Sequence, residues 1–314
     1  MSRIPWIVLL AVLSTASPAL AAKKALFDNY HAEQAGNADW VVDDTQPIPS
    51  PAQSGITSGT AETSWTGALS AWGVALVKQG YTVETNNVAL TYGNSGNPRD
   101  LANYDVLVID EPNTRFTSAE ATAILAFVRN GGGLIAISDH SGSDRNNDGY
   151  DSPMIWNALD PTHLLGVHFA VSGESNNNIS QTSTNVRTAS SDSITRGPVG
   201  SVTGLAYHNG STLTLYASVN TSVRGEVWMN GTAQTSTTGV MCASSVYGNG
   251  RVVFVCDSSP ADDGTGASGN SLYNGWTEAG ATDGTLFLNA TLWATRRAGD
   301  VTAPVVAVTA PVGF

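Results

Sequence analysis

Positive charge is scarce in this sequence. Lysine and arginine together number 14 of 314 residues against 26 aspartates and glutamates, and the formal net charge is -12. Nucleic-acid binding needs clustered Lys and Arg side chains to neutralise phosphates, and no such cluster occurs, so nucleic acid is not an expected partner. The acidic surplus favours bound cations, or solubility alone. Only 13% of residues are charged, which is more typical of an extracellular, turn-rich protein than of a cytosolic enzyme.

Long apolar runs are also lacking. The longest, at residues 4–13, is too short for a permanent membrane helix, and no later stretch approaches about 18 apolar residues. Stable membrane insertion is therefore not expected. Because this run follows Arg3 and precedes small residues ending at Ala21, residues 1–22 are predicted to be a secretory signal peptide. The mature protein is expected to be secreted or extracellular, with the periplasm as an alternative.

The chain has only two cysteines. Cys242 and Cys256 flank Gly248-Asn249-Gly250, which is a hairpin signal, and they lie equally far on either side of Asn249. We therefore expect them to face each other across two strands. An exported chain permits a disulfide at this position; the alternative is a pair of small buried thiols.

Several catalytic motifs are missing. There is no Walker loop, no dinucleotide fingerprint after the first strand, no HExxH and no CxxC. Ser141 follows a predicted strand as an elbow serine does, but its context DHSGS lacks the small residue two positions earlier that such an elbow uses. A serine nucleophile is therefore not expected.

What the sequence does contain is an alternation of strand and helix patterns. VLVID at residues 106–110 is an apolar run ending in an acid, typical of a strand buried on both faces of a parallel sheet. Thr117 and Glu120 form a capping box that opens a helix ending at Asn130. Further strands are predicted at 24–28, 83–85 and 134–138, and further helices at 62–79 and 285–296. This order predicts a flavodoxin-like, doubly wound α/β fold with a mainly parallel sheet.

Two regions depart from this alternation. Residues 160–239 are rich in Ser, Thr and Asn with short alternating segments, and we interpret them as an antiparallel β insertion. The α/β domain is predicted to span residues 23–298. Residues 299–314 begin DVTAPVVAVTAP, which resembles the opening strand of a bacterial immunoglobulin-like module; a linker or disordered tail is the alternative.

A loop with cation-ligand character follows the strand at 134–138. Asp144, Asn146 and Asp148, followed by Gly149, reproduce the first half of a calcium loop. The second half is missing, because Ile155 stands where the bidentate Glu would be. These three residues are predicted metal ligands, and a solvated surface turn is the alternative.

Acidic residues and a histidine also follow the predicted strands, where ligands bind in open α/β sheets. Carboxylates held close together cannot all stay ionised without a cation or shared protons. The predicted metal ligands of this group are Asp28, His31, Asp139 and Asp257. Asp110 and Glu111 end another predicted strand, Asp262 and Asp263 follow Asp257, and Asp28, Asp110, Asp139 and Asp257 are expected to point toward one crevice. Any one of them alone is more often a cap or a turn former.

Two neighbouring residues are the predicted catalytic pair. His140 follows Asp139 directly at a strand end and is a candidate general base or metal ligand. His163, His168 and His208 lie among apolar or β-patterned residues, where structural roles are expected. Some tryptophans could stack on sugars, but helical spacing places Trp65 and Trp72 in a core instead.

The stretch from Tyr104 to Ser141, YDVLVIDEPN followed by a capped helix and GGGLIAISDHS, resembles the class I glutamine-amidotransferase-like superfamily. That superfamily includes trehalose-utilisation-like proteins and domains of the gliding and intraflagellar-transport type. The ending YGNGRVVFVCDSSP is similar to secreted members. Amidotransferases carry a nucleophilic Cys after the strand corresponding to LIAIS, whereas this chain has Asp139-His140-Ser141 there, so the resemblance implies a fold without glutaminase chemistry.

These patterns predict a secreted, divalent-cation-dependent hydrolase acting on an extracellular polymer, with polysaccharide favoured over nucleic acid. Asp28, Asp139, His140 and Asp257 are expected to hold the ion and activate water; calcium, magnesium, manganese and zinc are all compatible. One alternative is a non-catalytic carbohydrate-binding or cell-surface domain with a structural calcium ion at 144–148. A second is an acid/base carboxylate pair without metal. The oligomeric state is left open.

Overall fold

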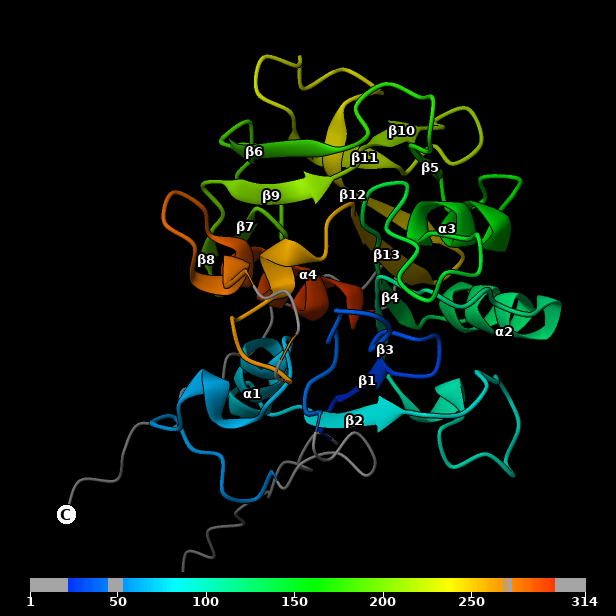
Figure 1. Ribbon diagram of the computed structural model, residues 1–314, viewed down its shortest axis with the longest axis vertical. Helices are drawn as coiled ribbons and strands as arrows, with labels where there is room; N and C mark the ends of the chain where they lie inside the picture. The colour runs from blue at the N-terminus through cyan, green and yellow to red at the C-terminus, as the bar shows by residue number, and fades with distance from the viewer. Residues whose placement is uncertain (1–21, 45–52, 268, 270–272, 297–314) are drawn as a thin grey trace, which may run out of the picture.

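A nine-stranded sheet forms the centre of the computed structural model, which describes residues 22–44, 53–267, 269 and 273–296 (Figure 1). Its parallel half has the strand order β2-β1-β3-β4-β13. The bounds are β1 Lys24–Asp28, β2 Thr82–Asn86, β3 Val106–Asp110, β4 Gly133–Ile137 and β13 Gly250–Val255. The order starts at an edge, reverses once and then runs outward, which confirms the flavodoxin-like doubly wound prediction.

The other half of the sheet is antiparallel, as predicted for the inserted region. It continues through β12 Val240–Tyr247, β10 Leu213–Leu215 and β5 Val167–Phe169, while β11 Arg224–Trp228 also pairs with β12. Two small antiparallel sheets flank it. One joins β6 Ile179–Ser183 to β9 Leu205–Gly210, and the other joins β7 Arg196–Gly197 to β8 Gly200–Ser201.

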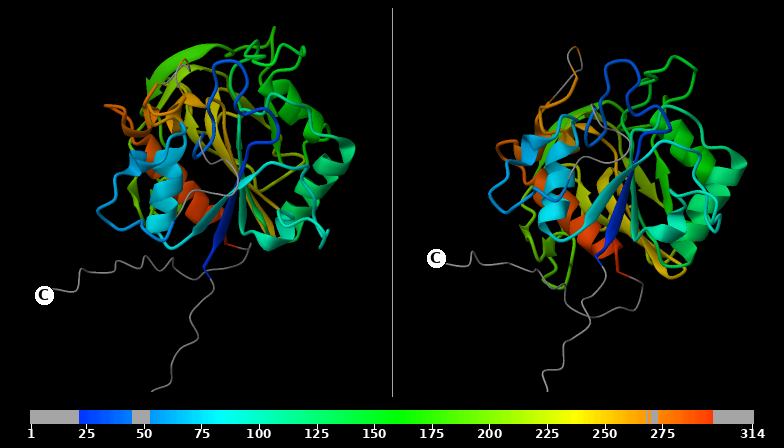
Figure 2. Two further views of the ribbon diagram at one scale, coloured as in Figure 1. Left: turned by 60° about the horizontal axis from the view of Figure 1, so that its bottom comes forward. Right: turned by 90° about the horizontal axis from the view of Figure 1, so that it is seen from below.

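Helices cover both faces of the sheet (Figure 2). α1 Ser70–Lys78 and α4 Asp283–Ala294 lie on one face, and α2 Ser118–Arg129 and α3 Ser152–Leu159 lie on the other. Short 3-10 turns occur at η1 Glu62–Ser64, η2 Leu101–Asn103, η3 Ser259–Ala261 and η4 Gly275–Thr277. The capping box predicted for α2 is present, with the Thr117 hydroxyl accepting from the Glu120 amide at 3.2 Å.

The helix predicted at 62–79 is wrong in its first half, because only α1 is helical beyond the η1 turn. The amides of Ala68 and Leu69 donate to the carbonyls of Asp39 and Val41 rather than to a preceding helical turn. A Cβ at Gly67 would lie 2.2 Å from the Val41 carbonyl oxygen, so this approach requires glycine. Tertiary contact with residues 39–41 therefore delays the start of the helix.

Aromatic packing fixes α1 and α4 to the sheet. The Trp72 ring meets Phe27 at 5.3 Å and Phe287 at 4.7 Å between centroids, and its Nε1 donates to Thr291 Oγ1 at 3.1 Å. Because Trp40, Trp65 and Trp276 are buried as well, none of these tryptophans offers an exposed platform for a sugar.

The two cysteines are buried and free, as in the alternative of two buried thiols, and the expectation that they face each other across the strands is wrong. In the β12–β13 hairpin Tyr247 pairs with Gly250, which leaves a two-residue turn, and Cys242 consequently pairs with Val255. Neighbouring residues of a strand point to opposite faces of a sheet, so the side chain of Cys256 lies on the other face from that of Cys242. A one-residue difference in register separates the thiols.

The predicted signal peptide, residues 1–22, and the predicted module start, residues 299–314, fall outside the described residues except for Ala22. Within the described part of the chain, no helix combines the length and apolar character needed to cross a membrane.

Candidate functional site

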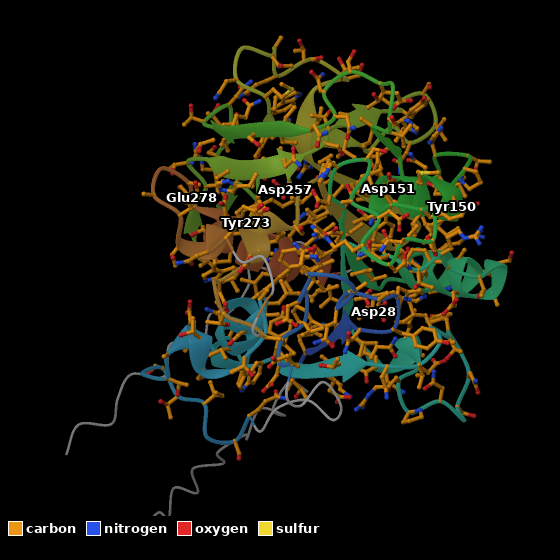
Figure 3. All side chains as sticks on the ribbon, in the orientation of Figure 1. Asp28, Tyr150, Asp151, Asp257, Tyr273 and Glu278 are labelled. Carbon is orange, nitrogen blue, oxygen red and sulfur yellow. The ribbon has the colours of Figure 1, made fainter. Side chains whose placement is uncertain are left out.

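The sheet register divides the strand-end acids between two faces. Phe27 pairs with Val108 on the face covered by α1 and α4. Side chains alternate along a strand, so Asp110 falls on that same face and Asp28 on the opposite one. The acids therefore form two clusters, and Figure 3 shows Asp28 and Asp257, one from each, apart from each other.

The first cluster contains Asp28, His31 and Glu33 and faces α2. One donor atom from each of the three lies within 4.8 Å of the other two, and all three residues are buried. His31 Nδ1 is 2.5 Å from Asp28 Oδ2, and its Nε2 is 3.2 Å from Glu120 Oε1 on α2. Asn86, at the end of β2, donates to Asp28 Oδ1 at 2.6 Å.

His31 and Asp28 are both held in their charged forms, because burial raises the pKa of Asp28 but the charge of His31 and hydrogen bonding lower it more. Burial lowers the pKa of His31, but Asp28 and Glu120 outweigh it and bring that pKa to about 10. Burial and the Asp28 charge raise the pKa of Glu33 well above its ordinary value. Neither Glu33 carboxylate oxygen accepts a hydrogen bond from a donor in the described structure. Two carboxylates and an imidazole are a ligand set that suits zinc or manganese.

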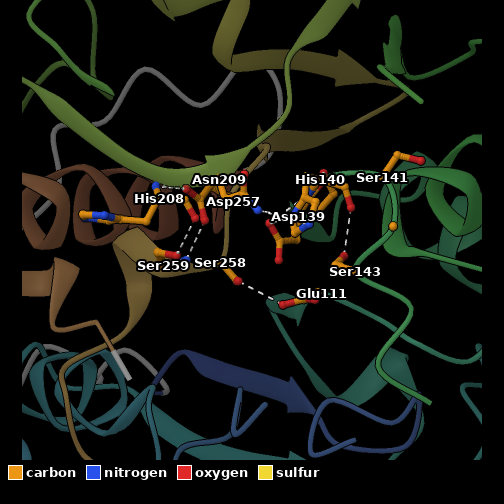
Figure 4. Close-up of polar contacts among 12 residues, drawn as sticks. Glu111, Asp139, His140, Ser141, Ser143, His208, Asn209, Asp257, Ser258 and Ser259 are labelled. Carbon is orange, nitrogen blue, oxygen red and sulfur yellow. Dashed lines mark hydrogen bonds and ion pairs between the residues drawn. The ribbon is translucent and has the colours of Figure 1, made fainter. Parts of the chain in front are cut away.

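The second cluster lies behind His140, at the end of β4 (Figure 4). Asp139 Oδ1 is 3.0 Å from His140 Nδ1 and accepts the His140 amide at 2.7 Å. Asp139 is 4% exposed, whereas His140 is partly exposed, and its Nε2 lies 3.2 Å from Nδ2 of Asn209. Burial lowers the pKa of His140, but hydrogen bonding and charge from Asp139 raise it more, so the pKa lies above its ordinary value.

Arg145 joins Asp139 to Glu111. Its Nε and Nη2 donate to the two Glu111 oxygens at 2.5 and 3.1 Å, and Nη2 also donates to Asp139 Oδ2 at 2.9 Å. The Ser258 hydroxyl donates to Glu111 Oε2 at 2.9 Å. Burial and the charge of Asp139 raise the pKa of Glu111 to about 7 despite Arg145.

Three further acids complete this second cluster. Asp257 accepts the amides of His208 and Ser259 at 2.5 and 2.9 Å, and burial together with Asp139 raises its pKa well above the ordinary value. Burial raises the pKa of Asp262 to about 6. Asp110 has no hydrogen-bond partner in the described structure, and burial plus its acidic neighbours raise its pKa strongly. Several of these acids therefore hold protons near neutral pH.

The structure thus places Asp139 and Asp257 in one cluster and Asp28 and His31 in the other. Among the described residues, the group with metal-ligand spacing contains Asp28, His31 and Glu33 and includes neither Asp139 nor Asp257. The two clusters are linked through Asn113, whose amide donates to the His31 carbonyl and whose Oδ1 accepts the Arg145 amide at 3.0 Å.

In the 144–148 loop the predicted ligand oxygens accept hydrogen bonds from the loop's own amides. Asp144 accepts from the amides of Asp148 and Gly149 at 3.0 and 2.7 Å, and Asp148 accepts from that of Tyr150 at 3.0 Å. Asn146 accepts from the Asp148 amide and donates to the Asn113 carbonyl. These contacts are those of a turn formed by Asp, Asn and Gly.

Three residues of the site were not singled out by sequence reasoning. Glu33 could have been found from its spacing, since it completes D-x-x-H-x-E after a predicted strand. Arg145 lies only six residues after Asp139, but its ion pairs depend on the conformation of the loop between them. Asn209 comes from β9, and no local pattern links it to His140. The Ser141 hydroxyl donates at 2.7 Å to the carboxylate of Asp151, which is the N-cap residue of α3.

Backbone strain also marks the second cluster. Glu111 and Asn209 have φ of 47° and 78°, in the left-handed region that residues other than glycine occupy infrequently. Such strain costs free energy and tends to gather at functional sites. Glu111 accepts from Arg145, and the Asn209 side chain contacts the ring of His140.

Comparison with known proteins gives a family and a fold. A family model described as "Domain of unknown function (DUF4350)" matches residues 60–268. A search of curated proteins gives no significant match.

Among solved structures, the mmIFT52 N-terminal domain is similar with a TM-score of 0.50 and 12% identity, over 88% of this chain and 99% of that one. A putative ThuA-like protein from Bacteroides uniformis has a TM-score of 0.44 and 15% identity, over 90% of this chain and 95% of that one. A second, from Parabacteroides merdae, has a TM-score of 0.45 and 13% identity, over 90% and 93%. At these identities the likeness concerns the fold alone.

Proposed function

This chain belongs to the family described as a domain of unknown function, DUF4350, and we propose that it is a hydrolase in which His140 is the general base. The observation that carries the proposal is the Asp139–His140 pair at the carboxyl end of β4. Asp139 is buried and contacts Nδ1 at 3.0 Å, while Nε2 lies toward the partly exposed side of the site. A carboxylate behind an imidazole orients the ring and stabilises its protonated form.

The neighbouring side chains support this assignment. In one protonation state Nδ1 donates to Asp139, which leaves Nε2 as the atom that accepts a proton from water. Asn209 Nδ2, 3.2 Å from Nε2, donates to that nitrogen in this state, so the attacking water has to take the place of the Asn209 amide. Asp262, whose pKa burial raises to about 6, can hold a proton near neutral pH, as a general acid for a leaving group must.

The divalent cation of the proposal is assigned to Asp28, His31 and Glu33 rather than to Asp139 and Asp257. Their donor atoms are close enough to share an ion, and the ion would replace the proton that the raised pKa leaves on Glu33. Loading requires that His31 release a ring proton. When bound, such an ion supplies Lewis acidity or fixes the loop that follows β1.

The substrate is proposed to be an extracellular polymer, polysaccharide in the first place. The net charge of -12 supports a neutral polymer over a polyanion, and export is supported by the signal-like first 22 residues. Membership of the secreted branch of the glutamine-amidotransferase-like superfamily, without its nucleophilic Cys, is proposed from the motifs that resemble it together with the flavodoxin-like sheet.

The test is hydrolysis by the purified protein of neutral polysaccharides, peptides and nucleic acids, with and without chelator. His140→Ala should abolish turnover without lowering the melting temperature. His208→Ala is the matched control, because it removes another partly exposed histidine paired with a carboxylate, 2.6 Å from Glu278, and its ring points away from Asp139 (Figure 4). Equal loss in both variants, or full activity in His140→Ala, would contradict the proposal.

The same experiment addresses the alternative, a non-catalytic carbohydrate-binding or cell-surface domain with a calcium ion at 144–148. That alternative predicts polysaccharide binding without turnover, and calcium-dependent melting that Asp144→Asn and Asp148→Asn remove. Turnover that survives chelation would instead favour acid/base chemistry by the second cluster alone.

A further inference from the structure

A cavity of about 430 Å³ lies at the antiparallel end of the sheet, beside β5 and β10. Its wall includes the rings of His163, His168 and Tyr216 and the hydroxyls of Thr212 and Thr214. Its lining contains no lysine or arginine, and Glu174 is its acidic residue. An anionic ligand therefore has no counter-charge in this cavity.

The aromatic part of the wall is rigidly held. Tyr216 and His163 stack with centroids 4.0 Å apart and ring planes 16° apart, and His168 meets His163 edge-on at 5.8 Å. The Tyr216 amide donates to the Gly166 carbonyl at 2.8 Å. His163 has φ of 57° and lies in a turn in which its carbonyl accepts from the Gly166 amide at 2.9 Å.

One ring nitrogen of each imidazole is engaged in a hydrogen bond. The His163 Nδ1 lies 3.1 Å from the Val167 carbonyl oxygen, which can only accept, so Nδ1 carries hydrogen and Nε2 of the neutral ring is an acceptor. His168 Nε2 lies 3.0 Å from a Glu174 carboxylate oxygen, so this nitrogen is the donor of the contact. The cavity thus combines flat rings with polar side chains.

We infer that this cavity binds a neutral saccharide. Sugar rings offer an apolar face that stacks on aromatic side chains and hydroxyls that both donate and accept. The cavity is joined to the proposed catalytic site by one loop: Thr212 Oγ1 donates to the Asn176 carbonyl at 3.3 Å, and Asn177 Oδ1 accepts the Ser141 amide at 2.8 Å. The inference rests on the proposed function for its substrate class and makes the cavity a binding site for the polymer next to His140.

The test measures binding separately from turnover. Xylohexaose, cellohexaose and maltohexaose are titrated calorimetrically into the mature His140→Ala protein, which should bind at least one of them. Tyr216→Ala in that background should weaken binding at least tenfold. Tyr273→Ala is the matched control, since Tyr273 also stacks on a histidine, His208 at 5.1 Å, outside the cavity, and it should bind normally.

Thr214→Tyr, which fills the cavity, serves if Tyr216→Ala does not fold, and should also weaken binding at least tenfold. Absence of binding by folded protein for all three probes, or unchanged affinity in the cavity variants, would overturn the inference. If binding depends on Tyr216 but the wild type hydrolyses none of the polymers, the hydrolase proposal is wrong and the saccharide site stands. If the wild type hydrolyses a polysaccharide and the cavity variants do so equally well, the saccharide site is wrong and the hydrolase proposal stands.

Discussion

Arg145 makes a bidentate contact with Glu111. Its Nε lies 2.5 Å from Oε1, and its Nη2 lies 3.1 Å from Oε2. The same Nη2 lies 2.9 Å from Asp139, so a single cation compensates two buried carboxylates behind the proposed base. Only a planar guanidinium reproduces this geometry; lysine does not.

Arg145→Met should therefore destabilise the protein by roughly 3–5 kcal/mol, because it leaves Glu111 buried and unpaired. The double variant Glu111→Leu, Arg145→Met should recover part of this loss, since the unpaired Glu111 charge is gone. Urea unfolding of the three proteins measures both effects. A double variant less stable than Arg145→Met alone would argue against this view of the ion pair.

Asp139→Asn should reduce kcat by roughly 10²–10⁴-fold, the range of general-base contributions. Asp139 raises the pKa of His140, and the base works only when neutral, so the variant's acidic limb should move to lower pH. NMR titration of the His140 ring checks the shift independently of activity. A ring pKa that is unchanged or higher in the variant would contradict the assigned contact.

Glu33→Gln should abolish cation-dependent stabilisation. In wild type, added manganese or zinc at 100 times Kd would raise stability by about 2.7 kcal/mol, and a chelator should reverse it. Glu278→Gln, which changes a carboxylate outside the cluster, should respond as wild type does. Calorimetric titration of wild type with no cation uptake at pH 7 would remove the metal assignment.

Glu226 should make stability fall as pH rises. Its pKa is raised from 4.5 to about 8 by burial, despite Arg224 2.8 Å away. Between these values the folded state keeps a proton that the unfolded state has lost, so the free energy of unfolding decreases with pH by up to about 1.4 kcal/mol per unit. Glu226→Gln should lack this component, whereas Glu278→Gln should retain it; parallel pH profiles for wild type and Glu226→Gln would refute it.

The free thiols give a direct chemical prediction. Because Cys242 pairs with Val255 rather than Cys256, protein denatured without reductant should take up two alkyl groups by mass spectrometry. Reductant should leave the melting temperature unchanged. Protection of both thiols from alkylation would show that the hairpin register differs from the one described.

Local sequence determined the elements that carry strong local signals. The apolar run at β3, the capping box at α2 and the alternation of strand with helix specify buried strands and crossovers, so the doubly wound sheet followed from pattern alone. The helix α3 was also predictable from local sequence, since Asp151 is its N-cap and Pro153 lies in its first turn. The start of α1 was not, because backbone contacts with residues 39–41 decide it.

Tertiary structure alone decided which acids meet. The sequence placed Asp28, Asp139 and Asp257 at strand ends, but residue parity in the paired strands sends Asp28 to the α2 face with Glu33, and the other two join Arg145 and Glu111 elsewhere. Side chains alternate with a period of two residues, so a shift of one position changes the face, as it does for Cys256. Composition and periodicity specify the helices and strands. Strand register and loop contacts depend on residues far apart in the sequence, and they bring the side chains of the site together.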